Sequence, residues 1–178
     1  MVEGFESEYL NAKERAILTL GMSGQSRLPS NRKVRECIGR ITQYQLGNEE
    51  VKRRIYEMRV IAERIMSLID DCDPFLIGST LSGEIRNGSD IDLHAYSDDF
   101  QILKERLHLF GIDDVEEEFV ENMKGSFCHL KWNEQGYPVE ITLYPWSWRE
   151  LIPISSVTGK PMKRAELKSV RKLLRTPG

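Results

Sequence analysis

Residues 75–99 read FLIGSTLSGEIRNGSDIDLHAYSDD and place two acids, Asp90 and Asp92, inside an otherwise apolar, strand-like stretch. Alternate residues of a strand point to the same side, so the two carboxylates share one face while Ile91 and Leu93 cover the other. Neighbouring carboxylates repel one another and resist the loss of water. Hard divalent cations such as Mg²⁺ prefer these oxygen ligands and would relieve that repulsion. The spacing therefore predicts a metal site, and a bridged pair of metals would support in-line displacement at phosphorus.

A Gly-Ser turn precedes the two acids. Gly78 has no side chain, so the backbone there can approach a phosphate closely, and Ser79 adds a hydroxyl donor. Arg86 lies in the loop between the turn and the acids, where its charge would neutralise phosphate, and Ser89 directly precedes Asp90. We expect these four residues to bind nucleotide. A surface arginine and a loop-forming serine are the alternative interpretations of Arg86 and Ser89.

A third acid, Glu140, stands in the strand-like segment PVEITLY between Val139 and Ile141. Buried acids need a partner, and if this strand lies beside the strand of Asp92, Glu140 completes a metal-binding triad. The alternative is an exposed acid on an edge strand. The rival acids Glu117, Glu118 and Glu121 belong to an acidic run that is typical of a solvated face.

His94 follows Asp92 by two residues and so shares its face of the strand. His94 lies one two-residue repeat further along the strand than a third metal ligand would need to lie. We therefore expect a structural histidine that is hydrogen-bonded within the fold.

The chain carries three motifs in this order: Gly78–Ser79 after an apolar residue, Asp90–Ile91–Asp92, and Glu140 between two apolar residues. Together they resemble the motifs of the DNA-polymerase-beta-type nucleotidyltransferase superfamily. The likeness covers residues 74–145 and is to the compact core of the minimal nucleotidyltransferases. It implies that Asp90, Asp92 and Glu140 bind two Mg²⁺ ions, with Mn²⁺ as an alternative, and that Gly78 and Ser79 bind a nucleoside triphosphate such as ATP.

The implied activity is metal-dependent transfer of a nucleoside monophosphate to an acceptor hydroxyl, with release of pyrophosphate. The acceptor stays open among an RNA end, a protein hydroxyl and a small molecule. The sequence departs from the family in two ways. The third acid is Glu140 here, whereas it is often Asp in the family. Larger relatives have a helical domain after the core, whereas only 33 residues follow Pro145 here. Contacts to base or acceptor would then come from the N-terminal helices, the tail helix or a second subunit.

The elements that must position these residues follow from the periodicity of apolar residues. We expect an α/β (α+β) fold in which a small mixed sheet is flanked by helices. A helical N-terminal extension at 1–73 would precede a catalytic core at 74–178. The expected helices span 6–20, 32–46, Asn48 to near Asp70–Asp73, 99–109 and 162–174, and the expected strands span 75–77, 90–96, 115–120, 126–132 and 137–145.

Composition limits the function classes. The net charge of −3 argues against a general polyanion binder, although 27–64 and 160–175 are locally basic. Three well-separated cysteines without a CxxC motif indicate a reducing compartment rather than a zinc site. The N-terminal MVEGFESEY does not have the pattern of a signal peptide, and no apolar run is long enough to span a membrane. We expect a cytoplasmic protein.

The sequence also allows a protein that is not an enzyme. One alternative is a nucleotide-binding regulator that has kept the site without turnover. Another is an antitoxin-like partner protein, with the N-terminal helices as the surface that binds a second protein or a second copy of the chain.

Overall fold

The computed structural model describes residues 2–22, 28–122, 125–155 and 159–176. The chain forms two compact units, one of Met1–Ile41 with Ile152–Met162 and one of Thr42–Leu151 with Lys163–Gly178. The predicted division into a helical N-terminal extension at 1–73 and a catalytic core at 74–178 stays a prediction. In the structure, the helix that precedes residue 73 belongs to the same compact unit as the sheet.

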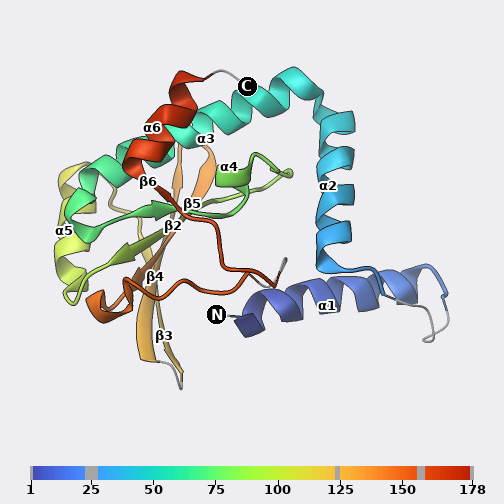
Figure 1. The fold of residues 1–178 in the computed structure, drawn as a ribbon, viewed down its shortest axis with the longest axis horizontal. Coiled ribbons are helices and arrows are strands. Elements are labelled where there is room, and N and C mark those ends of the chain that lie inside the picture. The colour runs from blue at the N-terminus through green and yellow to red at the C-terminus, as the bar shows by residue number, and fades with distance from the viewer. Residues whose placement is uncertain (1, 23–27, 123–124, 156–158, 177–178) are drawn as a thin grey trace. The chain divides into compact units, whose positions relative to one another are not determined.

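A mixed sheet of six strands, in the order β3-β4-β5-β2-β1-β6, forms the centre of the second unit (Figure 1). The pair β2–β5 is parallel and all other neighbours are antiparallel. This confirms the expected α/β class. The strands are β1 (Phe75–Leu76), β2 (Ile91–Tyr96), β3 (Glu116–Asn122), β4 (Gly125–Glu134), β5 (Tyr137–Tyr144) and β6 (Ala165–Glu166).

Helices α3 (Asn48–Leu68), α5 (Phe100–Leu109) and α6 (Leu167–Arg175) pack with this sheet. The apolar residues of α3 recur every three or four positions, which gathers them on one face. They form one core with the inward residues of the central strands and with Leu103, Leu107 and Val170. The buried members from α3 and from β2 and β5 are Val51, Met58, Ile61, Ala62, Ile65, Met66, Ile91, Leu93, Ala95, Val139, Ile141 and Leu143.

Helix α6 lies beside α3 (Figure 1). Arg171 of α6 bonds from Nε to Glu63 at 2.7 Å and from Nη2 to the Ser67 hydroxyl at 3.0 Å. The predicted basic helix at 162–174 therefore exists but begins later, at Leu167. Its first expected residues instead pair with β1 as the short strand β6, because backbone groups at the open edge of β1 take up their hydrogen bonds.

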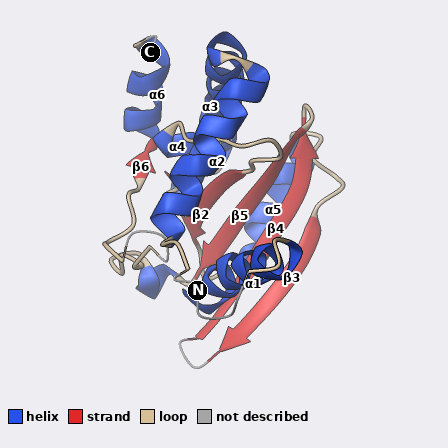
Figure 2. Ribbon diagram, turned by 90° about the vertical axis from the view of Figure 1, so that its right-hand side faces the viewer, coloured by secondary structure: helices blue, strands red, loops and turns tan. Residues whose placement is uncertain are grey.

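Three short elements complete the second unit. They are α4 (Gly78–Ser82), which follows β1 and precedes β2 along the chain, and the single 3₁₀ turns η1 (Asp70–Cys72) and η2 (Trp146–Trp148). Figure 2 turns the sheet toward the viewer and shows α4 beside α3, and α4 contacts the start of β2.

The first unit contains α1 (Val2–Thr19) and most of α2 (Asn31–Leu46). Thr42 is the buried residue of α2 and belongs to the second unit. Segment 152–162 folds back on itself through a bridge between Ile154 and Pro161. Within the described ranges, no helix combines the length and apolarity needed to cross a bilayer.

Candidate functional site

Two of the three predicted acids meet across the parallel pair of strands. Asp92 of β2 stands directly opposite Glu140 of β5 in the register. Paired residues of neighbouring strands project from the same face of the sheet and lie within side-chain contact of one another. The expectation that the two strands are neighbours is therefore confirmed. The alternative of Glu140 on an edge strand is wrong, because β5 lies between β4 and β2.

The Gly-Ser turn lies directly against the acids. The Ile77 N–H donates to the Asp92 carbonyl at 3.0 Å, which extends the β1–β2 pairing up to the turn. Gly78 then adopts a φ of +68°, and a Cβ added there would lie 2.2 Å from Asp92 Oδ2. The Asp92 carboxylate thus takes the space that a side chain at Gly78 would need, which only glycine permits.

A residue that the sequence reasoning passed over ties the turn to the other aspartate. Thr80 of α4 is fully buried, and its hydroxyl donates to the backbone carbonyl of Asp90 at 2.9 Å. Gly78, Ser79 and Thr80 are consecutive in α4, so the turn is fixed to the backbone on both sides of Ile91. A threonine after Gly-Ser was the available signal, since a buried hydroxyl requires a partner.

Negative charge is crowded at this face. Burial raises the pKa of the Asp92 carboxyl to about 8, and the charges of Asp90 and Glu140 add to the effect. The nearby Arg86 guanidinium acts in the opposite direction. A carboxyl held so far from its ordinary pKa lies where an added cation would relieve the repulsion. The donor set of hard oxygen atoms fits a divalent ion such as Mg²⁺.

Glu140 is engaged by neighbours from β4 rather than by the aspartates. His129 Nδ1 lies 2.7 Å from Glu140 Oε1, and Lys131 Nζ lies 3.8 Å from Oε2. The hydrogen bond from His129 and the two positive charges lower the pKa of Glu140 below its usual range, against the effect of burial. Among the described residues, no three His, Cys, Asp or Glu side chains are arranged to hold a metal ion. The structure therefore brings Glu140 beside Asp92 but leaves its carboxylate paired with His129.

Arg86 and Ser89 close the loop between α4 and β2. The Arg86 N–H donates to the Ser89 hydroxyl at 2.8 Å, and the Ser89 N–H donates back to the Arg86 carbonyl at 3.1 Å. Ser89 is buried and its hydroxyl serves the loop, whereas the Arg86 side chain is exposed. Their predicted roles toward nucleotide stay predictions.

His94 was expected to be a hydrogen-bonded structural histidine; it is buried, and its Nδ1 has no hydrogen-bond partner in the described part of the chain. Its ring instead meets Tyr144 edge-on at 5.1 Å between centroids. Burial lowers the pKa of His94 to about 4, and the charge of Arg164 adds to this. The imidazole is therefore neutral and packs within the sheet.

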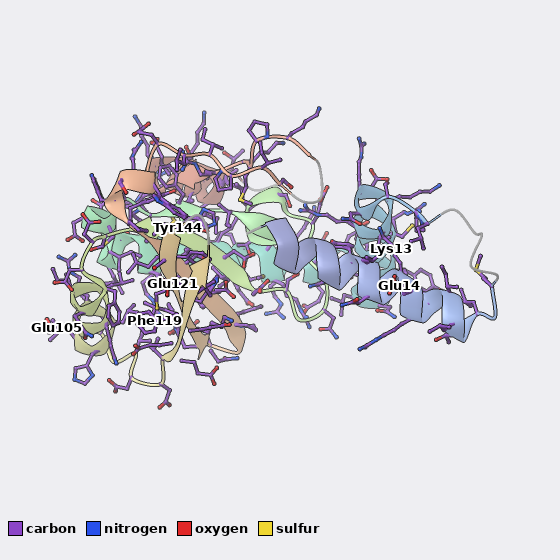
Figure 3. All side chains as sticks on the ribbon, turned by 90° about the horizontal axis from the view of Figure 1, so that it is seen from below. Lys13, Glu14, Glu105, Phe119, Glu121 and Tyr144 are labelled. Carbon is purple, nitrogen blue, oxygen red and sulfur yellow. The ribbon has the colours of Figure 1, made fainter. Side chains whose placement is uncertain are left out.

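The rival acids lie on β3 at the edge of the sheet, where Figure 3 labels Glu121 beside Phe119. Glu118 pairs with Lys131 at 2.7 Å, and Glu117 pairs with Lys104 of α5. Two strands, β4 and β5, separate β3 from the strand of Asp92. Glu117 and Glu118 therefore form ion pairs at the sheet edge, and none of the three acids joins the carboxylates of β2.

No family model matches the chain, and no curated protein sequence matches it. Among solved structures, it is similar to a cytoplasmic RNA terminal U-transferase at 19% identity and a TM-score of 0.37, over 64% of this chain and 34% of that one. It is also similar to the Cid1 poly(U) polymerase with bound MgGTP, at 15% identity and a TM-score of 0.37, over 64% and 38%. A further structure of Cid1, described as an RNA terminal uridylyl transferase, matches at 18% identity and a TM-score of 0.35, over 51% and 30%. The chain thus spans about a third of the length of these proteins, and the overlap of the folds is partial.

Proposed function

We propose that this chain is a nucleotidyltransferase of the superfamily that its motifs resemble, which binds a nucleoside triphosphate with Mg²⁺ and transfers the nucleoside monophosphate to an acceptor hydroxyl. One observation carries the proposal: a side-chain-free turn at Gly78 lies against the Asp92 carboxylate, and Asp92 is in register with Glu140. The Gly-Ser turn and the oxygen ligands of Asp92 and Glu140 thus occur at one place on the sheet. The three free cysteines fit a cytoplasmic location.

Each residue has a distinct part in this proposal. Asp90 and Asp92 would hold the metal, and Glu140 would join them on leaving His129. When bound, Mg²⁺ or Mn²⁺ would supply positive charge against the phosphates. Ser79 would donate its hydroxyl to a phosphate oxygen, while Gly78, which has no side chain, lets the Asp92 carboxylate lie against the turn.

The reaction follows from this placement. The acceptor hydroxyl oxygen would form a bond to the α-phosphorus and give its proton to a neighbouring carboxylate of the site, while the bond from that phosphorus to the oxygen that bridges it to the β-phosphate would break and pyrophosphate would leave. The protein contributes mainly by positioning the reactants and neutralising charge. The same arrangement fits any accessible hydroxyl, so the acceptor must be found by experiment.

Calorimetric titration with non-hydrolysable analogues of ATP, GTP, CTP and UTP tests the proposal. We expect binding by the wild type only with Mg²⁺ or Mn²⁺, and loss of that binding in Asp90→Asn and Asp92→Asn. The exposed Asp114 lies in the loop before β3 and offers a matched control as Asp114→Asn. A folded wild-type protein that binds none of the four analogues would refute the proposal.

A second candidate is nucleotide binding without turnover. The observation that favours it is the pairing of Glu140 with His129 and Lys131 in place of a three-carboxylate cluster. Release of pyrophosphate separates the two candidates. An enzyme releases it in the presence of a suitable acceptor and stops when Glu140 is replaced by Gln, whereas a regulator binds nucleotide and releases none across a panel of RNA, protein and small-molecule hydroxyls.

The antitoxin-like alternative rests on exposed apolar side chains of the N-terminal helices, among them Leu18 of α1 at 80% and Tyr44 of α2 at 92% exposure. A contiguous patch of such side chains would mark a surface that binds a partner. Size-exclusion chromatography of the purified chain, alone and after mixing with lysate, tests this. A chain that migrates as a monomer in both cases would exclude a stable partner bound through these helices.

A further inference from the structure

A half-buried arginine of α3 bonds to the short helix α4, which begins with the Gly-Ser turn. Arg59 of α3 donates from Nε to the Thr80 carbonyl at 3.1 Å and from Nη2 to the Leu81 carbonyl at 3.0 Å. These carbonyls belong to the last turn of α4, where helix carbonyls have no partner within the helix. The two bonds fix both the position and the rotation of α4, because a planar guanidinium presents its donors in a rigid fork.

Arg59 is committed to this contact. Among the described residues it has no carboxylate within ion-pairing distance, unlike Arg53, Arg54 and Arg64 of the same helix. Burial lowers the pKa of Arg59, and no acid opposes that effect. A guanidinium that loses part of its hydration and bonds only to two backbone carbonyls has a structural role and does not simply add surface charge.

The same short helix is held by β2 on its other side. The Thr80 hydroxyl bonds to the Asp90 carbonyl, and the Ile77 N–H bonds to the Asp92 carbonyl just before α4 begins. Thr80 thus uses its side chain toward β2 and its carbonyl toward Arg59. Gly78 and Ser79 stand at the start of an element that is clamped between α3 and the strand of the acids.

We propose that Arg59 is a positioning residue for triphosphate binding. It sets the distance between the Gly78–Ser79 turn and the carboxylates of Asp90 and Asp92 that triphosphate binding requires. This inference rests on the proposed function and names a residue of α3 that does not itself touch the nucleotide. Without the clamp, α4 would stay attached to β2 but would rock about Thr80. A displacement of about 1 Å in a positioning element is enough to weaken binding and catalysis strongly.

The test compares Arg59→Met with Arg59→Lys and with Arg64→Met. Methionine keeps the apolar stem of the side chain and removes both donors, and lysine keeps the charge without the rigid two-donor fork. Arg64 lies on the same helix and pairs with Glu134, so Arg64→Met removes an arginine without affecting α4. Calorimetry with the analogue that the wild type binds best, in Mg²⁺, gives the affinity for triphosphate. Titration with Mn²⁺ in the absence of nucleotide measures separately the affinity of the carboxylates for the metal.

We expect Arg59→Met to bind the analogue about tenfold more weakly or worse, Arg59→Lys to fall between it and wild type, and Arg64→Met to match wild type. Binding of Mn²⁺ alone should change by less than about twofold in all three. Hydrogen exchange of the backbone amides of residues 78–83 should be faster in Arg59→Met than in Arg64→Met.

Three results would overturn the inference. If wild type and Arg59→Met bind the analogue equally well, Arg59 does not position the turn, although the proposed function stands. If Mn²⁺ and analogue binding fall together in Arg59→Met, the residue merely supports the fold. If the wild type binds no analogue, the proposed function itself fails and the role of Arg59 fails with it.

Discussion

Gly78 and Asp92 are packed so closely that a Cβ added at Gly78 would lie 2.2 Å from Oδ2 of Asp92. Atoms do not approach to that distance without a bond, so either the turn or the carboxylate would have to move. The φ of +68° at Gly78 adds a second reason for glycine, because side chains disfavour this conformation. The glycine therefore determines where the Asp92 carboxylate lies.

Replacement of Gly78 by alanine should abolish Mg²⁺-dependent nucleotide binding, because it displaces Asp92 from the turn. Gly111→Ala is the matched control, since Gly111 has a φ of +78° with nothing within 4 Å of an added Cβ. Both variants should lose about 1–2 kcal/mol of unfolding free energy from the backbone conformation. Only Gly78→Ala should lose nucleotide in a calorimetric titration. Equal binding by the two variants would contradict the proposed closeness of the turn to the phosphates.

The raised pKa of Asp92 predicts that the metal-free protein becomes less stable as pH rises. Between about pH 4 and about pH 8 the folded state keeps a proton on Asp92 that the unfolded chain has released. The contribution of Asp92 to stability is thus complete below its unfolded pKa and is lost as the pH rises toward about 8, at up to about 1.4 kcal/mol per pH unit.

Urea unfolding in EDTA from pH 7 to pH 8 measures this slope, because below about pH 6.5 the lowered pKa of His94 has the opposite effect on stability. Asp92→Asn should flatten it, because the amide does not titrate, while Asp114→Asn should keep it. A wild-type slope that survives in Asp92→Asn would assign the proton to another group.

The local pattern of residues predicted much of the site. Alternation along each strand showed that Asp92 and Glu140 face away from the core, and the Gly78–Ser79 turn marked where a side chain is excluded. Both inferences need only neighbours in the sequence. The strand β6 and the helix α4 were harder to predict, because elements of two and five residues have too few positions for a period.

The residues that the sequence reasoning missed depend on contacts between distant segments. His129 reaches Glu140 because β4 and β5 pair around a turn at Gln135 and Gly136, both with positive φ. Counting outward from that turn would have paired Lys131 with Glu140 and His129 with Thr142. No comparable count leads from α3 to α4, so Arg59 could not be linked to Thr80 without the fold.

The pair of His129 and Glu140 predicts a specific change in the titration of Glu140. Removal of the imidazole in His129→Gln takes away the main cause that lowers the pKa of Glu140 and leaves the opposing effect of burial. The pKa of Glu140 should therefore rise. Carbon-13 NMR of the glutamate carboxyls, assigned with Glu140→Gln, measures the shift. His108→Gln serves as a control, because His108 is exposed and pairs with Asp113 instead. An unchanged Glu140 titration in His129→Gln would show that the imidazole does not hold the carboxylate in solution.

Helix α3 should be as necessary to the sheet as the strands are, because its apolar face shares their core. Ile65 of α3 has no exposed surface and packs in the same cluster as Leu93 of β2, whereas Val60 of the same helix is 41% exposed. Ile65→Ala removes three buried carbon atoms and should lower the unfolding free energy by about 2–5 kcal/mol. Val60→Ala removes two carbon atoms that are partly in water and should cost less than about 1 kcal/mol. Urea denaturation followed by circular dichroism compares the two. Similar small losses would mean that α3 folds apart from the sheet, as a boundary between residues 73 and 74 would require. A large loss at Ile65 would instead assign α3 to the core that positions Arg59 and the turn.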